Sequence, residues 1–313
     1  MNFKETKPLE QLRLFWYGSV EVKLSYLIDK SLAGRELRLL ALGPWGFSEK
    51  LWKRIKWNGR ILVNGREHHD ARLRVKTGDR VELIWQEKTN VIPVQLPLDI
   101  LYEDDMLLVV NKPANMLIHP TYGSSRDTLV HAVAGYLARK GEQAGVHPLY
   151  RLDRDTTGVV VIAKSAKVQY EMTRRHDQLS REYLAIIEGH LANKKGRLTE
   201  PIGPDPAHKN CWMVRRDGRS AVTEYEVVKE GPNCSLLKIH LLTGRTHQIR
   251  VHFSSIGHPL IGDRLYGRTC QLLARQALHA QCISFAHPHD GRKIICQAPV
   301  PDDMQQFMQS CFT

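Results

Sequence analysis

The segment from Tyr150 to Gly158 carries the residues best suited to chemistry, because two carboxylates and two arginines lie within five consecutive positions. The apolar run of residues 159–163 follows at once and predicts a buried strand. Charged groups at the start of a buried strand are costly unless they are paired or used. Nearby arginines favour the ionised form of Asp153, and a positioned carboxylate can act as a nucleophile or a base. The alternative interpretation is a structural Asp–Arg pair that closes a turn.

Three further segments concentrate polar and charged residues. Residues 109–121 contain the triplet Asn111-Lys112-Pro113, residues 181–189 contain Tyr183, and residues 242–252 hold two arginines, two histidines and a glutamine. One short motif matches by chance, whereas four in a fixed order rarely do. In this order the four segments resemble the motifs of the RluA family of pseudouridine synthases, over about residues 100 to 300.

This resemblance implies an enzyme that breaks the bond between uracil nitrogen and ribose, turns the base and rejoins it through carbon. No atoms are gained or lost, so we expect no cofactor. The resemblance implies Asp153 as the catalytic carboxylate and Arg245 as its ion-pair partner. It implies that Tyr183 stacks on the flipped uracil and takes part in the late proton removal. Three roles of Asp153 remain open, namely attack on the ring, attack on the sugar carbon, or assistance to proton loss from the sugar.

The remaining candidate site residues are predicted to contact RNA. They are phosphate-binding arginines, a base-packing isoleucine and two further basic residues, namely Arg151, Arg154, Arg250, Ile249, Lys112 and His247. Ile249 would face away from its neighbours if this segment were a strand. The Asn111-Lys112-Pro113 triplet is expected to shape the cleft wall.

Three positions need separate comment. Asp155 competes with Asp153, since a spacing of two places both on the same side of an extended chain, and only the family motif favours Asp153. Tyr150 stands where the family usually has histidine, and Asn115 where it usually has glycine. Asparagine tolerates the left-handed conformation, so the loop at Asn115 can be kept. These departures bear on the target more than on the activity.

Composition supports a nucleic-acid partner. The 313 residues include 45 Lys and Arg against 33 Asp and Glu, a net charge of +12. Such a basic chain suits a polyanion, of which nucleic acid is the commonest. We find no apolar stretch long enough for a membrane span, and the polar stretch Met1 to Glu10 predicts no signal peptide. We therefore expect a cytoplasmic monomer that binds RNA and no membrane.

The six cysteines are scattered over the second half of the chain and are expected to be reduced thiols. A zinc site built from Cys282, His287, His289 and Cys296 is the alternative. Their spacing matches no zinc pattern, and the two cysteines stand in apolar surroundings. We predict no metal site.

Residues 1–90 are predicted to form a small α+β domain. A helix over Ser48 to Lys56 would bury Leu51, Trp52 and Ile55 and expose a basic face that includes Lys53 and Arg54. A short strand follows between two Asn-Gly turns, and a closing strand comes after residues 75–80. This pattern resembles the RNA-binding domain named after ribosomal protein S4. The alternative is a small packing domain with a merely solvated basic face.

A linker is expected over Gln86 to Pro97, and the catalytic domain over residues 98–313. Strands are predicted at residues 107–110, 158–163, 183–188, 221–228, 235–242 and 294–297. Helices are predicted at residues 127–139 and 166–176, with Asp127 and Ser165 as N-caps, and at 268–280. No Gly-rich phosphate loop is present. The sequence thus predicts an α+β domain with a mostly antiparallel sheet, and the resemblance implies the pseudouridine synthase fold, with a mixed sheet crossed by a cleft.

Four functional hypotheses follow. The first is a synthase that modifies uridines in large-subunit ribosomal RNA, because family members with such an added domain mostly act there. The second replaces that target with transfer RNA. The third is a catalytically silent RNA-binding or ribosome-assembly factor. The fourth, an RNA methyltransferase, is disfavoured by the missing Gly-rich cofactor loop.

Overall fold

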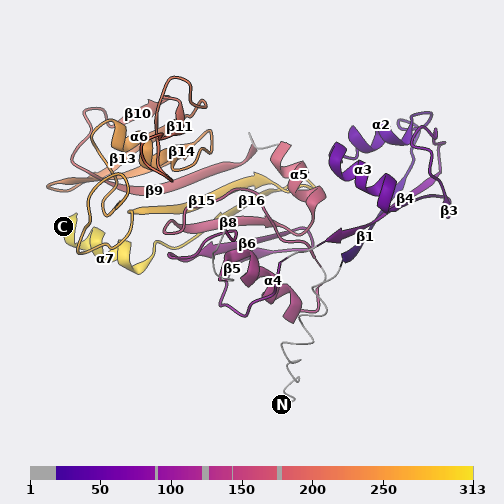
Figure 1. Ribbon diagram of the computed structural model, residues 1–313, viewed down its shortest axis with the longest axis horizontal. Helices are drawn as coiled ribbons and strands as arrows, with labels where there is room; N and C mark the ends of the chain where they lie inside the picture. Colours follow the sequence, from indigo (N-terminus) through magenta and orange to yellow (C-terminus); the bar gives the residue numbers. More distant parts are fainter. Residues whose placement is uncertain (1–18, 89–90, 122–126, 143, 175–177, 313) are drawn as a thin grey trace, which may run out of the picture.

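The chain forms two units, each with its own sheet and its own core (Figure 1). The computed structural model describes residues 19–88, 91–121, 127–142, 144–174 and 178–312. The predicted absence of a signal peptide at residues 1–10 and the predicted helix end at His176 lie outside the described residues. Within them, no helix is long and apolar enough to cross a membrane.

The first unit is a four-stranded antiparallel sheet with two helices. Its strand order is β1 (Ser19–Leu27), β4 (Arg80–Lys88), β2 (Arg60–Val63) and β3 (Arg66–Glu67). Helices α2 (Leu37–Leu42) and α3 (Glu49–Asn58) share its core. In α3, Leu51, Trp52 and Ile55 are buried, and the Leu51 amide donates to Ser48 Oγ at 3.1 Å, which caps the helix. The predicted helix is confirmed with its end shifted by two residues.

The β2–β3 turn shows how local sequence decides local structure. Asn64 and Gly65 both adopt positive φ, at 53° and 78°. A two-residue hairpin turn of this kind needs positive φ at both positions, which asparagine and glycine tolerate best. The Asn64 side chain also joins the turn to the closing strand, since its Oδ1 accepts from the Arg80 amide at 2.9 Å.

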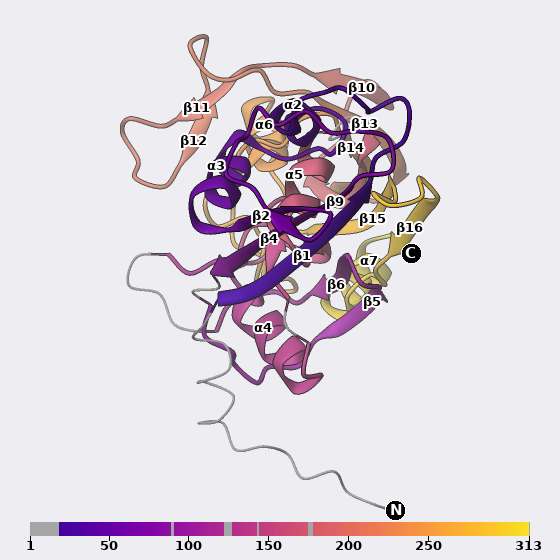
Figure 2. The same cartoon turned by 90° about the vertical axis from the view of Figure 1, so that its right-hand side faces the viewer.

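The second unit is built on a ten-stranded mixed sheet, in which eight strands follow one another in hydrogen-bonded order. Its order is β10 (Lys195–Leu198), β13 (Thr223–Glu230), β14 (Cys234–Leu241), β9 (Ser180–Glu188), β15 (Leu278–Ala286), β8 (Thr157–Ala163), β6 (Leu107–Lys112) and β5 (Asp99–Glu103). Off this path, β16 (Lys293–Gln297) pairs with β15 and β7 (His147–Pro148) pairs with β8. A small hairpin of β11 (Ile202–Pro204) and β12 (Trp212–Val214) stands apart, as Figure 2 shows. All six predicted strands are present, with shifted ends.

The two halves of this sheet meet at β8 and β15, which is the single parallel pairing among the described strands. It consists of two residue pairs, His279 with Thr157 and Ala280 with Gly158. Gly158 has φ 111°, and a Cβ there would lie 2.1 Å from the Ala280 carbonyl oxygen, so only glycine fits. The polar segment 151–156 therefore enters the sheet at the line between its halves.

Four helices complete the second unit. They are α4 (Leu129–Arg139), α5 (Ala166–Arg174), α6 (Gln248–Ser255) and α7 (Asp302–Cys311). The Val168 amide donates to Ser165 Oγ at 3.2 Å, which confirms that predicted cap. Asp127 is not the N-cap of α4, because Thr128 holds that position.

One predicted helix is wrong. Residues 268–280 form no helix, and Leu278–Ala286 instead form the central strand β15 between β9 and β8. Its apolar residues suit either element, and burial on both sides of the sheet selects the strand. The segment that holds Ile249 is helix α6 rather than a strand.

Candidate active site

Asp153 lies in the loop before β8, and Arg250 of α6 holds it. Arg250 Nη1 donates to Asp153 Oδ2 at 2.8 Å. The other oxygen, Oδ1, lies 3.8 Å from His247 Nε2, beyond hydrogen-bond distance. The Asp153 side chain is 24% exposed. One carboxylate oxygen is thus fixed by the protein, and the other remains available to a substrate.

Arg250 is itself held from behind by Asp263. Its Nε and Nη2 donate to the two Asp263 oxygens at 2.7 and 2.8 Å, a bidentate pair in which Asp263 is fully buried. Its guanidinium also stacks on the Tyr266 ring, 5.0 Å from the centroid. Burial alone would lower the pKa of Arg250, but the Asp263 hydrogen bonds and the charge of Asp153 raise it above its ordinary value. The guanidinium is therefore a permanent, oriented cation.

His247 lies beside Asp153 and Tyr266 in the same site. It precedes α6 in the left-handed conformation, φ 55°. Its Nδ1 lies 2.7 Å from the Tyr266 hydroxyl, whose pKa burial raises to about 12. Burial lowers the pKa of His247. We infer that the Tyr266 hydroxyl donates to Nδ1 and that the neutral ring carries its proton on Nε2, toward Asp153.

The loop after Asp153 is anchored at four consecutive residues. Lys112 Nζ donates to the Arg154 carbonyl at 2.9 Å, and Arg275 Nη1 to the Asp155 carbonyl at 3.2 Å. Two side-chain contacts follow along the loop, namely Gln276 Nε2 to Thr156 Oγ1 at 3.2 Å and His279 Nδ1 with Thr157 Oγ1 at 2.9 Å. Three of these four contacts come from residues 275–279 at the start of β15, and together they give Asp153 a rigid base.

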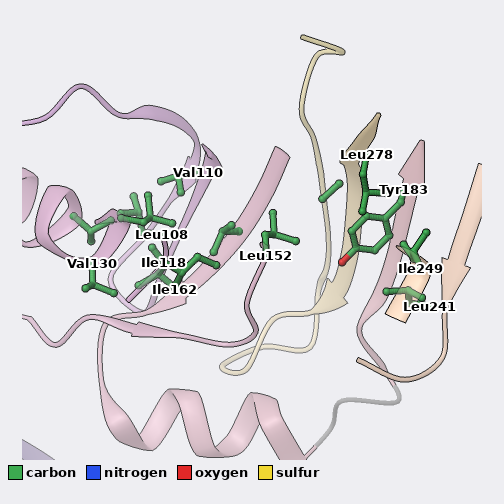
Figure 3. Packing of buried hydrophobic residues seen from close by; sticks show 14 of the residues in the cluster. Leu108, Val110, Ile118, Val130, Leu152, Ile162, Tyr183, Leu241, Ile249 and Leu278 are labelled. Carbon is green, nitrogen blue, oxygen red and sulfur yellow. The ribbon is translucent and has the colours of Figure 1, made fainter. Parts of the chain in front are cut away.

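A cleft of about 1190 Å³ opens over this loop. Asp153, Tyr183, Arg245 and His247 are among its lining residues, together with Arg151 and Arg154. Tyr183 of β9 is buried, and burial raises its pKa, so the resting side chain is a neutral phenol. Figure 3 shows Tyr183 grouped with Leu241, Ile249 and Leu278 on one side of Leu152, and Leu108 and Ile162 on the other. The cleft therefore lies where the two halves of the core meet.

The predicted pairing of Asp153 with Arg245 is wrong. Arg245 Nε donates to the Ser220 carbonyl at 2.8 Å, and Arg250 takes the place beside Asp153. The prediction that Arg250 binds phosphate fails for the same reason, because its side chain is 7% exposed and used by two carboxylates. The turn into α6 decides this, since Gln248 Oε1 accepts from the Arg245 amide at 2.9 Å and the helix then carries Arg250 inward.

Lys112 was predicted to contact RNA, but its side chain points into the protein. It is fully buried, and its Nζ donates to the carbonyls of Pro113, Met116 and Arg154. Burial lowers its pKa to about 7. The residue therefore secures the loop at Asn115, whose φ of 57° agrees with the predicted left-handed turn.

The other predicted residues fall in different places. Arg151 and Arg154 are exposed at the cleft, and Asp155 lies there beside Arg154, with Nε and Oδ1 at 3.5 Å. Ile249 is buried in the core below. In the first unit, Lys53 is 71% exposed, whereas the Nε of Arg54 is buried.

Sequence reasoning missed the supporting residues. Asp263 was assigned no role, and Arg275, Gln276 and His279 fell in a predicted helix. The last three residues contact the loop across more than 100 residues of sequence, so no local pattern indicates these contacts.

The residues once considered for zinc are used otherwise. His287 Nε2 lies 2.8 Å from Asp104 Oδ2, and its Nδ1 lies 3.2 Å from Asp290. The six cysteines are free thiols. No cluster of three or more metal-binding side chains occurs within the described ranges.

The fold is that of the pseudouridine synthases. The solved structure of human RNA Pseudouridylate Synthase Domain Containing 4 matches 67% of this chain and 92% of its own, with a TM-score of 0.54 and 23% identity. Human RNA Pseudouridylate Synthase Domain Containing 1 matches with a TM-score of 0.53, 22% identity, and coverage of 68% and 94%.

Sequence comparison gives the family. Residues 106–255 match the family described as RNA pseudouridylate synthase. Over 311 residues the chain is 33% identical to ribosomal large subunit pseudouridine synthase D of Haemophilus ducreyi, covering 93% of this chain and 92% of the relative. It is 41% identical over 245 residues to the uncharacterized RNA pseudouridine synthase YhcT of Bacillus subtilis, covering 76% and 81%. The chain belongs to the RluA-type family of RNA pseudouridine synthases, isomerases that convert uridine in RNA to pseudouridine.

Proposed function

We propose that this enzyme isomerises specific uridines in large-subunit ribosomal RNA, as a cytoplasmic monomer. The named activity of the Haemophilus ducreyi relative, which matches nearly the whole chain, supports this target. The strong positive charge supports a large polyanionic substrate. Transfer RNA remains the second candidate target.

We assign the central role to Asp153, and the observation that carries this is its Arg250-fixed carboxylate on the floor of a large cleft. Flipping moves the target uridine out of its stack and into such a pocket. Oδ1 can then approach the sugar–base junction while Oδ2 stays bound to Arg250. In the overall reaction the C1′–N1 bond breaks, a C1′–C5 bond forms, C5 loses a proton and N1 gains one. Tyr183 would retain the detached base by stacking.

We propose that the first unit, residues 1–90, is an S4-like RNA-binding domain joined to a catalytic domain of residues 98–313. Helix α3 supports this assignment, because Lys50 and Lys53 are exposed on the face opposite its buried side. Trp57 is 73% exposed, with Lys56 Nζ 4.8 Å from its ring centroid. Exposed aromatic and basic side chains together suit nucleic acid. Arg151 and Arg154 would contact phosphates at the cleft.

Asp153→Asn tests this function. Asparagine keeps the size of the side chain and can still accept from Arg250, but it loses the charge. We expect no tritium release from ribosomal RNA labelled at uridine C5, with RNA affinity unchanged within a few fold. Asp155→Asn, in the same loop, is the matched control and should keep most of the activity.

Mapping pseudouridines in RNA from cells with and without the gene identifies the target. A site lost from large-subunit ribosomal RNA supports the proposal, and a site lost from transfer RNA supports the second candidate. If the wild-type protein released no tritium from any cellular RNA, a silent binding or assembly factor would replace the enzyme.

A further inference from the structure

Glu87 joins the two units of the molecule. It lies near the end of β4, in the first unit, yet it is only 2% exposed. Its Oε1 accepts from the backbone amide of Ala166, the first residue of α5, at 2.8 Å. A carboxylate at the first amide of a helix satisfies an otherwise unpaired donor and interacts favourably with the helix dipole. A side chain of the first unit thus binds the first amide of a catalytic-unit helix whose N-cap is Ser165.

A histidine of the catalytic unit lies beside the same carboxylate. His147 Nε2, before β8, lies 2.9 Å from Glu87 Oε1, within ion-pair distance although not aligned as a hydrogen bond. Burial raises the pKa of Glu87, but His147, the Ala166 amide and the charge of Arg54 together bring it below its ordinary value. Arg54 belongs to the basic helix α3. Glu87 therefore connects β4, which shares a core with α3, to α5 and β7 of the catalytic unit.

Helix α5 extends this connection toward the cleft. At its first turns, Lys167 Nζ lies over the Phe47 ring of the first unit, 5.7 Å from the centroid. The negative charge of Glu171 adds to burial in raising the pKa of Tyr26, a residue of β1. At the other end of α5, Met172 and Thr173 line the cleft. One short helix therefore touches both the first unit and the substrate cleft.

We propose that Glu87 is a positioning residue that fixes the basic helix α3 at a set orientation to the catalytic cleft, and thereby selects which uridine of a structured RNA reaches Asp153. This rests on the proposed RNA binding by the first unit. Two linked binding surfaces act together only when their geometry matches the spacing of their sites on the partner. A rigid connection between them fixes the distance between the RNA segment bound at α3 and the base that reaches Asp153. Loss of the Glu87 contact should leave the reaction at Asp153 intact but allow other uridines to be modified.

The test compares Glu87→Ala with Glu87→Gln and with Glu82→Ala. Alanine removes both the acceptor of the Ala166 amide and the negative charge, whereas glutamine keeps an acceptor for that amide. Glu82 is the matched control, since it lies on the same strand and pairs with Lys23 inside the first unit at 2.6 Å. Each protein is incubated with a full-length large-subunit ribosomal RNA transcript, and pseudouridines are mapped at every position. Small-angle scattering reports the arrangement of the units.

For Glu87→Ala we expect the ratio of target to off-target pseudouridine to fall by about tenfold or more, because small misplacements of a substrate are costly. The radius of gyration should rise as the units separate. Glu87→Gln should recover most of the selectivity, and Glu82→Ala should match the wild type.

Two results would overturn the proposal. One is an unchanged site pattern in Glu87→Ala, even with a uniform loss of rate, since that is the mark of a merely structural residue. The other is an unchanged radius of gyration. Failure of the proposed function looks different, because the wild-type protein itself would then leave the transcript unmodified.

Discussion

At the scale of single residues, the site depends on one arginine shared by two carboxylates. Arg250 gives Nη1 to Asp153 and its remaining donors to the buried Asp263. A guanidinium fits this use because its planar fork can serve two acids at once, whereas an ammonium is a single point charge. Asp263 therefore sets where Arg250 presents its third nitrogen to Asp153.

Arg250→Gln should abolish this arrangement. We expect kcat for tritium release to fall by roughly 100-fold or more, since Asp153 loses its orientation. The unfolding free energy should fall by about 3–5 kcal/mol, because Asp263 is left as an unpaired buried charge. Arg250→Lys keeps the charge and should fold better, yet it cannot serve both acids and should remain slow. Kinetics and urea unfolding measure the two effects.

Arg245→Gln is the control for that substitution. Arg245 is half-buried and donates to the Ser220 carbonyl. Its loss should cost about 1 kcal/mol or less of stability and affect KM more than kcat. If Arg245→Gln reduced kcat as strongly as Arg250→Gln, the observed ion pair would not be the one that matters in catalysis.

At the scale of elements, the parallel junction between β8 and β15 places the loop. Gly158 and Ala280 approach so closely that a Cβ would meet the Ala280 carbonyl oxygen at 2.1 Å. The loop that holds Asp153 thus ends on a backbone contact that no larger residue permits. This accounts for glycine directly after the two threonines, and it ties the position of Asp153 to the line where the halves of the sheet join.

Gly158→Ala should force the backbones of residues 158 and 280 apart. We expect a loss of several kcal/mol, since about 1 kcal/mol of backbone strain adds to a collision with backbone atoms that cannot move freely. Gly291→Ala is the matched control, because Gly291 has φ 73° in the β15–β16 turn with open space around it, and it should cost only about 1 kcal/mol. Chemical denaturation of both variants checks the difference. Equal losses would show that strain alone, and not the close approach, explains Gly158.

At the scale of the whole molecule, buried histidines link the fold to pH. His279 of the central strand is fully buried, between Thr157 and the Ala298 carbonyl. Burial lowers its pKa from 6.5 to about 4. The unfolded chain therefore binds more protons than the folded chain between these values, so stability falls as the pH decreases from 6.5 to 4. Burial lowers the pKa of His247 and His252 in the same direction.

His279→Gln should weaken this dependence. In the wild-type protein we expect His279 to account for roughly 3 kcal/mol of stability lost across that window. The variant should be less stable than the wild type at neutral pH, but its free energy of unfolding should decrease less on acidification. Urea unfolding at several pH values between 7 and 4 measures both slopes. Parallel slopes in the two proteins would show that His279 does not titrate in this range.

Much of the architecture was predictable from local pattern. The buried runs of β6 and β8, the capped amphipathic helix α3 and the Asn-Gly turn after β2 each follow from side-chain periodicity or turn chemistry over a few residues. The start of β15 could not be predicted in this way, because residues 278–280 are all buried and show no alternation that separates a strand from a helix.

The sequence by itself determined the family and singled out Asp153, because both depend on residue types in a fixed order along the chain. Only the tertiary structure decided that Arg250 rather than Arg245 holds that carboxylate, that Lys112 supports a loop, and that Glu87 joins the two units. Asp153 and Arg250 are 97 residues apart. Spacing along a chain sets which side chains share a face of one element, whereas contacts between distant elements depend on how the whole chain packs.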